Sequence, residues 1–411
     1  MNTAERAARV MARADELATH SAMEGGILRA YLTPEQARVN AIASAWMREA
    51  GLRVWPDAAA NVCGRRLTDD DDRPAVLLGS HLDTVPGAGR YDGILGVLVA
   101  IEVADRLRDA DLPFALEVVA FGDEEGTRFG TTLLGSRALA GVWKPEWLDL
   151  VDADGVTLRD AATTFGIDPE RIPEAARTPE SLVAYLECHI EQGPRLEAID
   201  APLGVVSTIA AAERRMISFR GEARHAATPW ELRRDALLGA SEAIVAIERV
   251  ARDRDGNATV GRIRVEPDAV NVVPGFAEFS LDLRDATAAA RDSTWAAIRH
   301  ELHRIAGDHS LDLDVTTTHV APEAPCADHL RAALKAGISS VTGEDDPVDL
   351  VSIAGHDAMA VAEVTDIGML FVRCAGGISH HADESVLVED VAAAIDAFEA
   401  TVLHLAATHR A

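Results

Sequence analysis

The sequence predicts an α/β protein: a mostly parallel mixed sheet flanked by helices, interrupted by an inserted α+β domain. At 411 residues, the chain exceeds the size at which one hydrophobic core usually stops growing. Apolar strand patterns alternate with helical patterns over 1–207 and 320–411, as expected for a parallel sheet covered on both faces. Residues 208–319 predict two β-α-β-like halves around a small sheet. We therefore expect a discontinuous main domain, 1–207 with 320–411, and an inserted domain, 208–319.

The first predicted element of the main domain is a helix near 34–50. Thr33 is a suitable N-cap, Pro34 fits the first turn and Gly51 ends the helix. The elements expected next are strands at 61–67, 75–80, 114–121 and 183–190, with a helix at 93–108. The four aspartates at 69–72 predict a solvated hairpin tip between the first two strands.

The inserted domain and the return to the main domain follow the same reasoning. The inserted domain is predicted to hold strands at 213–222, 259–266, 276–284 and 311–319 and helices at 233–252 and 288–306. The main domain resumes with helices at 328–341, 356–363 and 389–407 and a strand at 368–372. The sequence contains no internal repeat, so each domain is expected to be a single copy.

The composition excludes several classes of partner. The formal net charge is −28, from 39 Lys and Arg against 67 Asp and Glu, and such a surface repels nucleic acids and anionic membranes.

The first 26 residues lack the apolar core of a signal peptide, and no apolar run is expected to reach transmembrane length. Four widely separated cysteines are typical of free thiols in the reducing cytoplasm: Cys63, Cys188, Cys326 and Cys374.

Residues that can bind metal gather where predicted strands end, the place where open α/β sheets carry their sites. His81 and Asp83 alternate at the end of one strand and so point to one side, and Asp92 follows in a glycine-rich turn. Glu124 and Glu125 follow a second strand, where adjacent carboxylates repel one another unless a cation is near. Taken singly, each group is more often a solvated surface feature than a metal site.

Two further strand ends carry histidines. His189 ends the strand at 183–190, and His380 and His381 follow the strand at 368–372. The four strand ends of one predicted sheet thus supply histidines and carboxylates but no cysteine. This donor set suits a catalytic Zn²⁺, Mn²⁺, Co²⁺ or Ni²⁺ ion better than a structural zinc. The residues together favour a metal site.

The sequence resembles the amidase/hydantoinase/carbamoylase branch of the dinuclear metallopeptidase–aminoacylase superfamily over essentially its whole length. The motifs GSHLDTV, YDGILG, EEGTRF, HIEQGP, NVVPG, GHDAM and GGISH occur in the family's order. The branch includes N-carbamoyl-L-amino acid, allantoate and ureidoglycolate amidohydrolases and β-ureidopropionases. The resemblance implies a zinc exopeptidase-like catalytic domain, an inserted lid that also forms a homodimer, and hydrolysis of an N-carbamoyl (ureido) amino acid or allantoate.

The resemblance also implies a set of metal ligands. Asp92 would bridge two divalent ions, with His81 and His189 on one and Glu125 and His380 on the other. An acid usually occupies the position of His189 in the wider peptidase branch, so HIEQG points to the amidase branch. His381 falls at a variable family position, and the resemblance gives it no role.

The implied chemistry needs a base and an oxyanion donor beside the metals. Glu124 would take a proton from water and deliver it to the leaving nitrogen, while Asp83 would steady His81. His225, in the inserted domain, would stabilise the tetrahedral oxyanion from the opposite subunit of the homodimer. The implied substrate contacts are Arg284 and Asn271 to a carboxylate, and Gln192 and His356 to the ureido group or pocket wall.

The chain departs from the branch at positions that border the implied substrate pocket. It has HAATPW where many members have HAGTTPM, and Val372-Arg373-Cys374 where many have FVPS. An aminoacylase or dipeptidase of the same superfamily therefore stays an alternative, favoured by HAATP and opposed by HIEQG. A non-catalytic binding protein is a second alternative, but such a protein would be expected to lack a ligand or the base, and every such position is filled.

Overall fold

The structure is a computed structural model that describes residues 1–66, 70 and 72–409. The chain divides into two compact units. The first comprises Met1–Ser207, Pro325–Leu350 and His356–Ala411, and the second comprises Thr208–Ala324 and Val351–Gly355. The predicted hairpin around the four aspartates is wrong, because the flanking strands, Val62–Arg66 and Ala75–His81, do not pair and Ala115–Phe121 lies between them. Two of these aspartates, at 69 and 71, lie outside the described residues.

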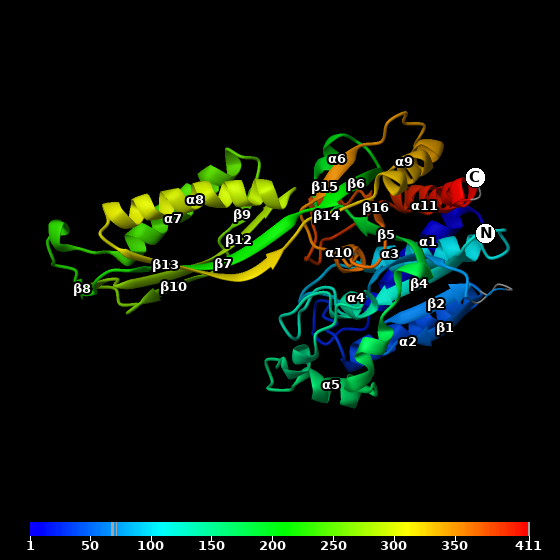
Figure 1. Ribbon diagram of the computed structural model, residues 1–411, viewed down its shortest axis with the longest axis horizontal. Helices are drawn as coiled ribbons and strands as arrows, with labels where there is room; N and C mark the ends of the chain where they lie inside the picture. Colours follow the sequence, from blue (N-terminus) through cyan, green and yellow to red (C-terminus); the bar gives the residue numbers. More distant parts are fainter. Residues whose placement is uncertain (67–69, 71, 410–411) are drawn as a thin grey trace. The chain divides into compact units, whose positions relative to one another are not determined.

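A mixed sheet of nine strands is built mostly from the first unit (Figure 1). In chain order its strands are β1 (Leu52–Pro56), β2 (Val62–Arg66), β3 (Ala75–His81), β4 (Ala115–Phe121), β5 (Leu182–Ile190), β6 (Leu203–Ile209), β14 (Ala324–Pro325), β15 (Asp349–Ser352) and β16 (Ile367–Val372). The order across the sheet is β1-β2-β4-β3-β5-β16-β6-β14, and β15 also pairs with β6. β4, β3, β5 and β16 are parallel neighbours, which confirms the predicted largely parallel sheet.

Helices cover this sheet and bury its strands. The helices that share one apolar cluster with β3, β4 and β5 are α1 (Thr3–Ala18), α2 (Pro34–Glu49), α3 (Ile94–Arg106), α9 (Asp328–Thr342) and α11 (Val388–His409). A second cluster contains residues of α4 (Leu134–Leu139) and α5 (Leu158–Phe165), and the short α10 (Ala358–Val361) contacts β5 and β16. Every residue of β3 and β4 is buried, as expected for parallel strands covered on both faces.

Local signals account for the helix ends that position the site. The Thr33 hydroxyl accepts the N–H of Gln36 at 3.3 Å and Pro34 opens α2, as the sequence predicts. α3 begins after Gly93, whose φ of 73° lies in the left-handed region that favours glycine. The predicted helix at 356–363 is shorter in the structure, where α10 covers only Ala358–Val361.

The expectation about transmembrane length is wrong for α11. This helix has 22 residues and a window of mean hydropathy 1.4, long and apolar enough to cross a membrane by length and composition. Half of that window is buried inside the protein, where α11 packs on α1, α3, α9 and β16. The apolar composition therefore serves the core of the first unit, because a helix surrounded by neighbours needs apolar residues on most sides.

The second unit is an antiparallel α+β arrangement. Its five-stranded sheet has the order β10-β12-β7-β13, with β9 also paired to β12: β7 (Ala211–Arg220), β9 (Asn257–Thr259), β10 (Ile263–Glu266), β12 (Phe276–Asp285) and β13 (Asp312–Ala321). α7 (Ala236–Arg252) and α8 (Ala288–Asp308) share one apolar cluster with this sheet. The predicted strand at 259–266 is two strands, because the register against β12 shifts by one residue between Thr259 and Ile263.

Candidate metal centre

Four adjacent strands bring the predicted ligands to one edge of the main sheet. His81 is the last residue of β3 and His189 the last but one of β5. Glu124 and Glu125 follow β4, and His380 follows β16. Because these four strands are parallel neighbours, their carboxyl ends meet at the same edge.

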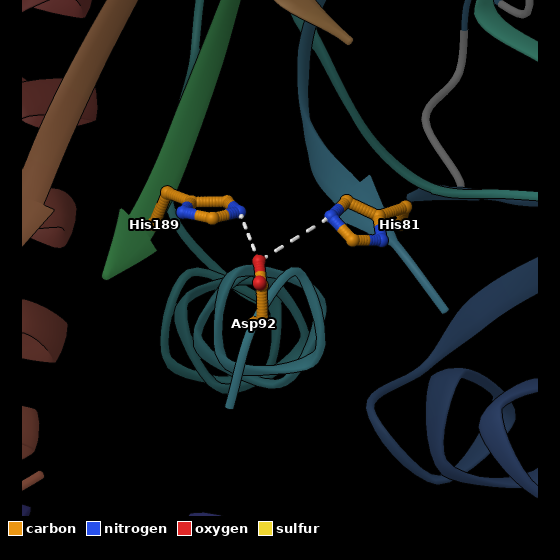
Figure 2. Close-up of side chains that lie close together, drawn as sticks. All are labelled: His81, Asp92 and His189. Carbon is orange, nitrogen blue, oxygen red and sulfur yellow. Dashed lines mark ion pairs between the residues drawn. The ribbon is translucent and has the colours of Figure 1, made fainter. Parts of the chain in front are cut away.

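His81, Asp92 and His189 form one group of possible metal ligands (Figure 2). Oδ1 of Asp92 lies 3.1 Å from Nε2 of His189 and 3.8 Å from Nε2 of His81. All three side chains are buried, and their ligand atoms lie within 4.8 Å of one another. Figure 2 shows the two rings on either side of Asp92, each directing a nitrogen toward the carboxylate.

Asp92, Glu125 and His380 form a second group, so Asp92 belongs to both. Nε2 of His380 lies 3.0 Å from Asp92 Oδ2 and 3.4 Å from Glu125 Oε1. His380 has a φ of 55°, in the left-handed region that residues other than glycine rarely adopt. Asp92 therefore offers one oxygen to each group, the arrangement of a carboxylate shared by two metal ions.

Backbone carbonyls orient the two buried histidine rings. Nδ1 of His81 lies 3.1 Å from the carbonyl oxygen of Asp83, and Nδ1 of His189 lies 2.9 Å from that of Ile190. A carbonyl oxygen only accepts, so each neutral ring carries its hydrogen on Nδ1 and keeps the lone pair of Nε2 directed at the Asp92 group. Metal-binding histidines are commonly held in this way.

The donor set fits a pair of divalent metal ions. Nε2 of His189 is buried and makes no hydrogen bond to any described residue, although Asp92 Oδ1 is close. Burial raises the pKa of Asp92, but His189 and His380 outweigh burial and hold that pKa well below its usual range. Hydrogen bonds to Asp92 and Glu125 raise the pKa of His380 to about 10. Carboxylates gathered beside histidine nitrogens, one of which has an unused lone pair, are typical of a site that binds a cation.

Glu124 lies beside these groups. Its carboxylate lies with His81 and Glu125 in a third group whose ligand atoms are within 4.8 Å of one another. Burial raises the pKa of Glu124 well above its usual value, and the charge of Glu125 raises it further. Both glutamates are held through their backbone, because the N–H of Glu124 donates to Asp83 Oδ1 at 2.9 Å and that of Glu125 donates to Asp83 Oδ2 at 3.1 Å.

Two predicted substrate contacts lie against the predicted metal ligands. Nε2 of Gln192 donates to Asp92 Oδ2 at 2.9 Å, while Gln192 Oε1 is buried and accepts no hydrogen bond from the described part of the chain. His356 is 1% exposed, and its ring packs edge-on against His189 with 4.4 Å between the ring centroids. The ring of His356 therefore packs against the ring of His189, a predicted metal ligand, and limits its movement.

Two predicted site residues lie at or beside short strands of the second unit. His225 is exposed at the end of β8 (Arg224–His225), and its Nδ1 accepts the N–H of Ala227 at 3.1 Å. The neutral ring therefore carries its hydrogen on Nε2 and can donate from it. Asn271 is exposed and precedes β11 (Val272–Val273), the strand that pairs with β8.

Arg284 on β12 is already engaged by an acid of its own strand. Nε and Nη2 of Arg284 donate to Asp282 at 2.7 and 3.2 Å, and Nη1 donates to the carbonyl of Ile353 at 2.8 Å. Burial raises the pKa of Asp282, but Arg284 and Arg214 outweigh it and hold the pKa below its usual value. A substrate carboxylate would have to compete with Asp282 for this guanidinium.

Sequence reasoning missed two residues that contact the Asp92 segment. The Ser379 hydroxyl lies 2.7 Å from Asp92 Oδ2, and buried Glu384 accepts the backbone N–H of Asp92 at 3.1 Å. Ser379 lies within the motif GGISH, and Glu384 follows that motif in sequence. Serine and glutamate in a loop have no pattern that separates them from solvated residues, so only their contacts reveal the role.

Known proteins resemble this chain over most of its length. A sequence profile of Peptidase family M20/M25/M40 matches residues 77–404. The N-carbamoyl-L-amino acid amidohydrolase of Geobacillus stearothermophilus is 41% identical over 389 residues, which cover 93% of this chain and 94% of that protein. The probable allantoate deiminase of Oryza sativa subsp. japonica is 37% identical over 420 residues, covering 93% and 85%. The solved structure of a hydantoinase/carbamoylase family amidase from Burkholderia multivorans has a TM-score of 0.87 at 34% identity, covering 97% of this chain and 98% of that one.

Proposed function

The chain belongs to the peptidase family M20/M25/M40 and is an amidohydrolase, and we propose that it hydrolyses the C–N bond of an N-carbamoyl (ureido) amino acid or of allantoate, releasing ammonia and CO₂. The observation that carries the proposal is Asp92, whose two oxygens face two separate ligand groups with Glu124 beside them. Relatives named for ureido substrates match this chain over nearly its whole length.

The residues at the site divide the proposed reaction between them. His81, Asp92 and His189 would hold one divalent ion, and Asp92, Glu125 and His380 the other, as Zn²⁺, Mn²⁺, Co²⁺ or Ni²⁺. When bound, such a pair supplies Lewis acidity that polarises the scissile carbonyl and acidifies water. Glu124 takes the water proton and delivers it to the departing nitrogen.

Four predicted residues would recognise a ureido acid. In the first unit, the buried Oε1 of Gln192 is an acceptor available to a ureido N–H. In the second unit, Arg284 and Asn271 would bind the substrate carboxylate. The substrate carboxylate would then replace Asp282 as acceptor for part of the Arg284 guanidinium. His225 would donate from Nε2 to the oxyanion, supplied by the opposite subunit of a homodimer.

We further propose that the enzyme works in the cytoplasm. Its four cysteines are free thiols and all four are buried, as expected where the surroundings are reducing.

A substrate screen tests the proposed function. Metal-free protein is loaded with Mn²⁺, Zn²⁺, Co²⁺ or Ni²⁺, and ammonia release is measured for N-carbamoyl amino acids and allantoate. The same preparations are tested on N-acetyl amino acids and dipeptides, since HAATPW keeps those classes open. We expect the highest kcat/KM for a ureido acid. A higher value for an acyl or peptide amide would contradict the substrate, and a protein that binds no metal would contradict the reaction.

A further inference from the structure

Glu384 is a buried carboxylate to which none of the catalytic roles above is assigned. It lies in the loop between β16 and α11 and is 4% exposed. Its Oε1 accepts the backbone N–H of Tyr91 at 2.7 Å and that of Asp92 at 3.1 Å. A carboxylate that accepts two consecutive backbone N–H groups fixes the direction of that backbone segment.

The other oxygen of Glu384 reaches the side chain of Asp92 through Ser379. The Ser379 hydroxyl lies 3.0 Å from Glu384 Oε2 and 2.7 Å from Asp92 Oδ2. A hydroxyl has one hydrogen to donate, so these two acceptors share it. Gln192 adds a second donor to Asp92 Oδ2, at 2.9 Å. The backbone and the side chain of Asp92 are thus both tied to Glu384, directly or through one hydroxyl.

Close packing leaves Glu384 little freedom. A Cβ placed on Gly89 would lie 2.3 Å from Cβ of Glu384 and 2.4 Å from its Oε1, so the glycine lets the turn before Asp92 lie directly on this side chain. The chain therefore brings a loop that follows β16 against the turn that precedes α3, and the point of contact is the residue common to both ligand groups.

We propose that Glu384 is a positioning residue that holds Asp92 in the orientation needed to bind both metal ions at once. It acts through the two N–H groups and Ser379 and touches neither substrate nor metal. The inference rests on the proposed dinuclear site and is independent of the substrate, because its test measures metal binding. It predicts that the affinity for both ions, and not only turnover, depends on the hydrogen bonds of a side chain outside the ligand set.

The test compares four variants of the full-length protein: Glu384→Ala, Glu384→Gln, Ser379→Ala and, as the matched control, Asp383→Asn. Asp383 is the adjacent carboxylate and is exposed. Metal-free protein is titrated with Mn²⁺ in a calorimeter, and the Tm of the metal-free protein is measured in parallel. Glu384→Ala should weaken binding of both ions by about 10- to 100-fold, the usual effect of losing a partner that orients a ligand.

The other variants separate positioning from general stability. Glu384→Gln should recover most of the affinity, because its amide oxygen still accepts both N–H groups and its amide nitrogen can donate to Ser379. Ser379→Ala should lower affinity with little change in Tm, and it decides the question if Glu384→Ala does not fold. Wild-type affinity in both Glu384→Ala and Ser379→Ala would overturn the inference, as would an equal loss in Asp383→Asn. Wild-type protein that binds no Mn²⁺ would instead overturn the dinuclear site itself.

Discussion

Asp83 orders two parts of the site at the scale of a single residue. Its backbone carbonyl lies against Nδ1 of His81, and its side-chain oxygens accept the N–H groups of Glu124 and Glu125. The carboxylate is fully buried, so its charge is screened little by solvent. Asp83 thus orients the ring of His81, a predicted metal ligand, and the turn that carries the proposed base. Substitutions of His81 and of Glu124 should therefore separate metal binding from proton transfer.

Changing Glu124→Gln should leave metal content near that of wild type but lower kcat by at least about 10²-fold, because an amide cannot take the proton from water. Changing His81→Ala should instead deplete metal. Metal analysis of both purified variants, with kcat on the best substrate of the screen, checks the pair. Near-normal activity in Glu124→Gln would remove Glu124 as the base.

Changing Gly93→Ala should weaken metal binding through His81. A Cβ at this position would lie 2.3 Å from Cε1 of His81, and φ is 73°. Gly87→Ala is the matched control, since Gly87 has φ of 72° and nothing within 4 Å of the added carbon. Both variants carry similar backbone strain of about 1 kcal/mol, so a difference between them isolates the displaced ring. We expect at least about tenfold weaker metal binding for Gly93→Ala only. Equal affinities in the two variants would argue against His81 as a ligand.

At the scale of elements, α1 is joined to α3 by charge as well as by apolar packing. Glu102 of α3 is fully buried and accepts hydrogen bonds from three arginines of α1, Arg6, Arg9 and Arg13. α1 and α3 also contribute to one apolar cluster. Because α3 begins directly after Asp92 and Gly93, the anchoring of α3 bears on the position of the turn that carries the shared ligand.

Changing Glu102→Gln should lower the free energy of unfolding by about 3–5 kcal/mol, because it leaves three arginines around a buried group that is no longer charged. Urea unfolding of the metal-free protein measures the change. Glu174→Gln is the control, since Glu174 pairs with Arg171 on the exposed surface and should leave stability nearly unchanged. A loss in Glu102→Gln no larger than in the control would show that apolar packing alone holds α1.

At the scale of the whole molecule, the proposed catalytic groups are divided between two compact units. All five predicted metal ligands and Glu124 belong to the first unit, whereas His225, Asn271 and Arg284 belong to the second. A residue of the second unit can serve a site of its own subunit or of a partner subunit. Because we propose that His225 comes from the opposite subunit, dimerisation would be part of the active site, and mixing subunits tests this.

Mixing inactive His225→Ala with inactive Glu124→Gln subunits should restore activity if His225 acts in trans. In a mixed dimer, the subunit that lacks His225 keeps its base and borrows the histidine of its partner. Random reassortment makes about half of the dimers mixed, each with one complete site, so roughly a quarter of wild-type activity should return. Subunit exchange is verified separately with labelled chains. No recovery after verified exchange would mean that His225 acts in cis.

Local sequence patterns were enough for the fold class and for most elements. Helix caps and strand periods depend on neighbours in sequence, so α2, α3 and the strands β3, β4, β5 and β16 could be predicted closely. Histidines and carboxylates at the ends of four strands then predicted that the candidate metal ligands lie at one edge of the sheet, because the carboxyl ends of parallel strands meet at the same edge. The split of 259–266 into β9 and β10 could not be predicted, since a one-residue register shift depends on β12.

The tertiary structure alone decided how those residues act on one another. No local pattern marks Glu384 as a partner of Asp92, because the two lie 292 residues apart and meet only through long-range packing. The same holds for the packing of His356 against His189 and for the apolar helix α11, whose environment is the core of a folded unit. Residue type and period are properties of a segment, so sequence determined which groups are present and on which elements. Hydrogen bonding and burial depend on distance in space, which only the folded chain defines.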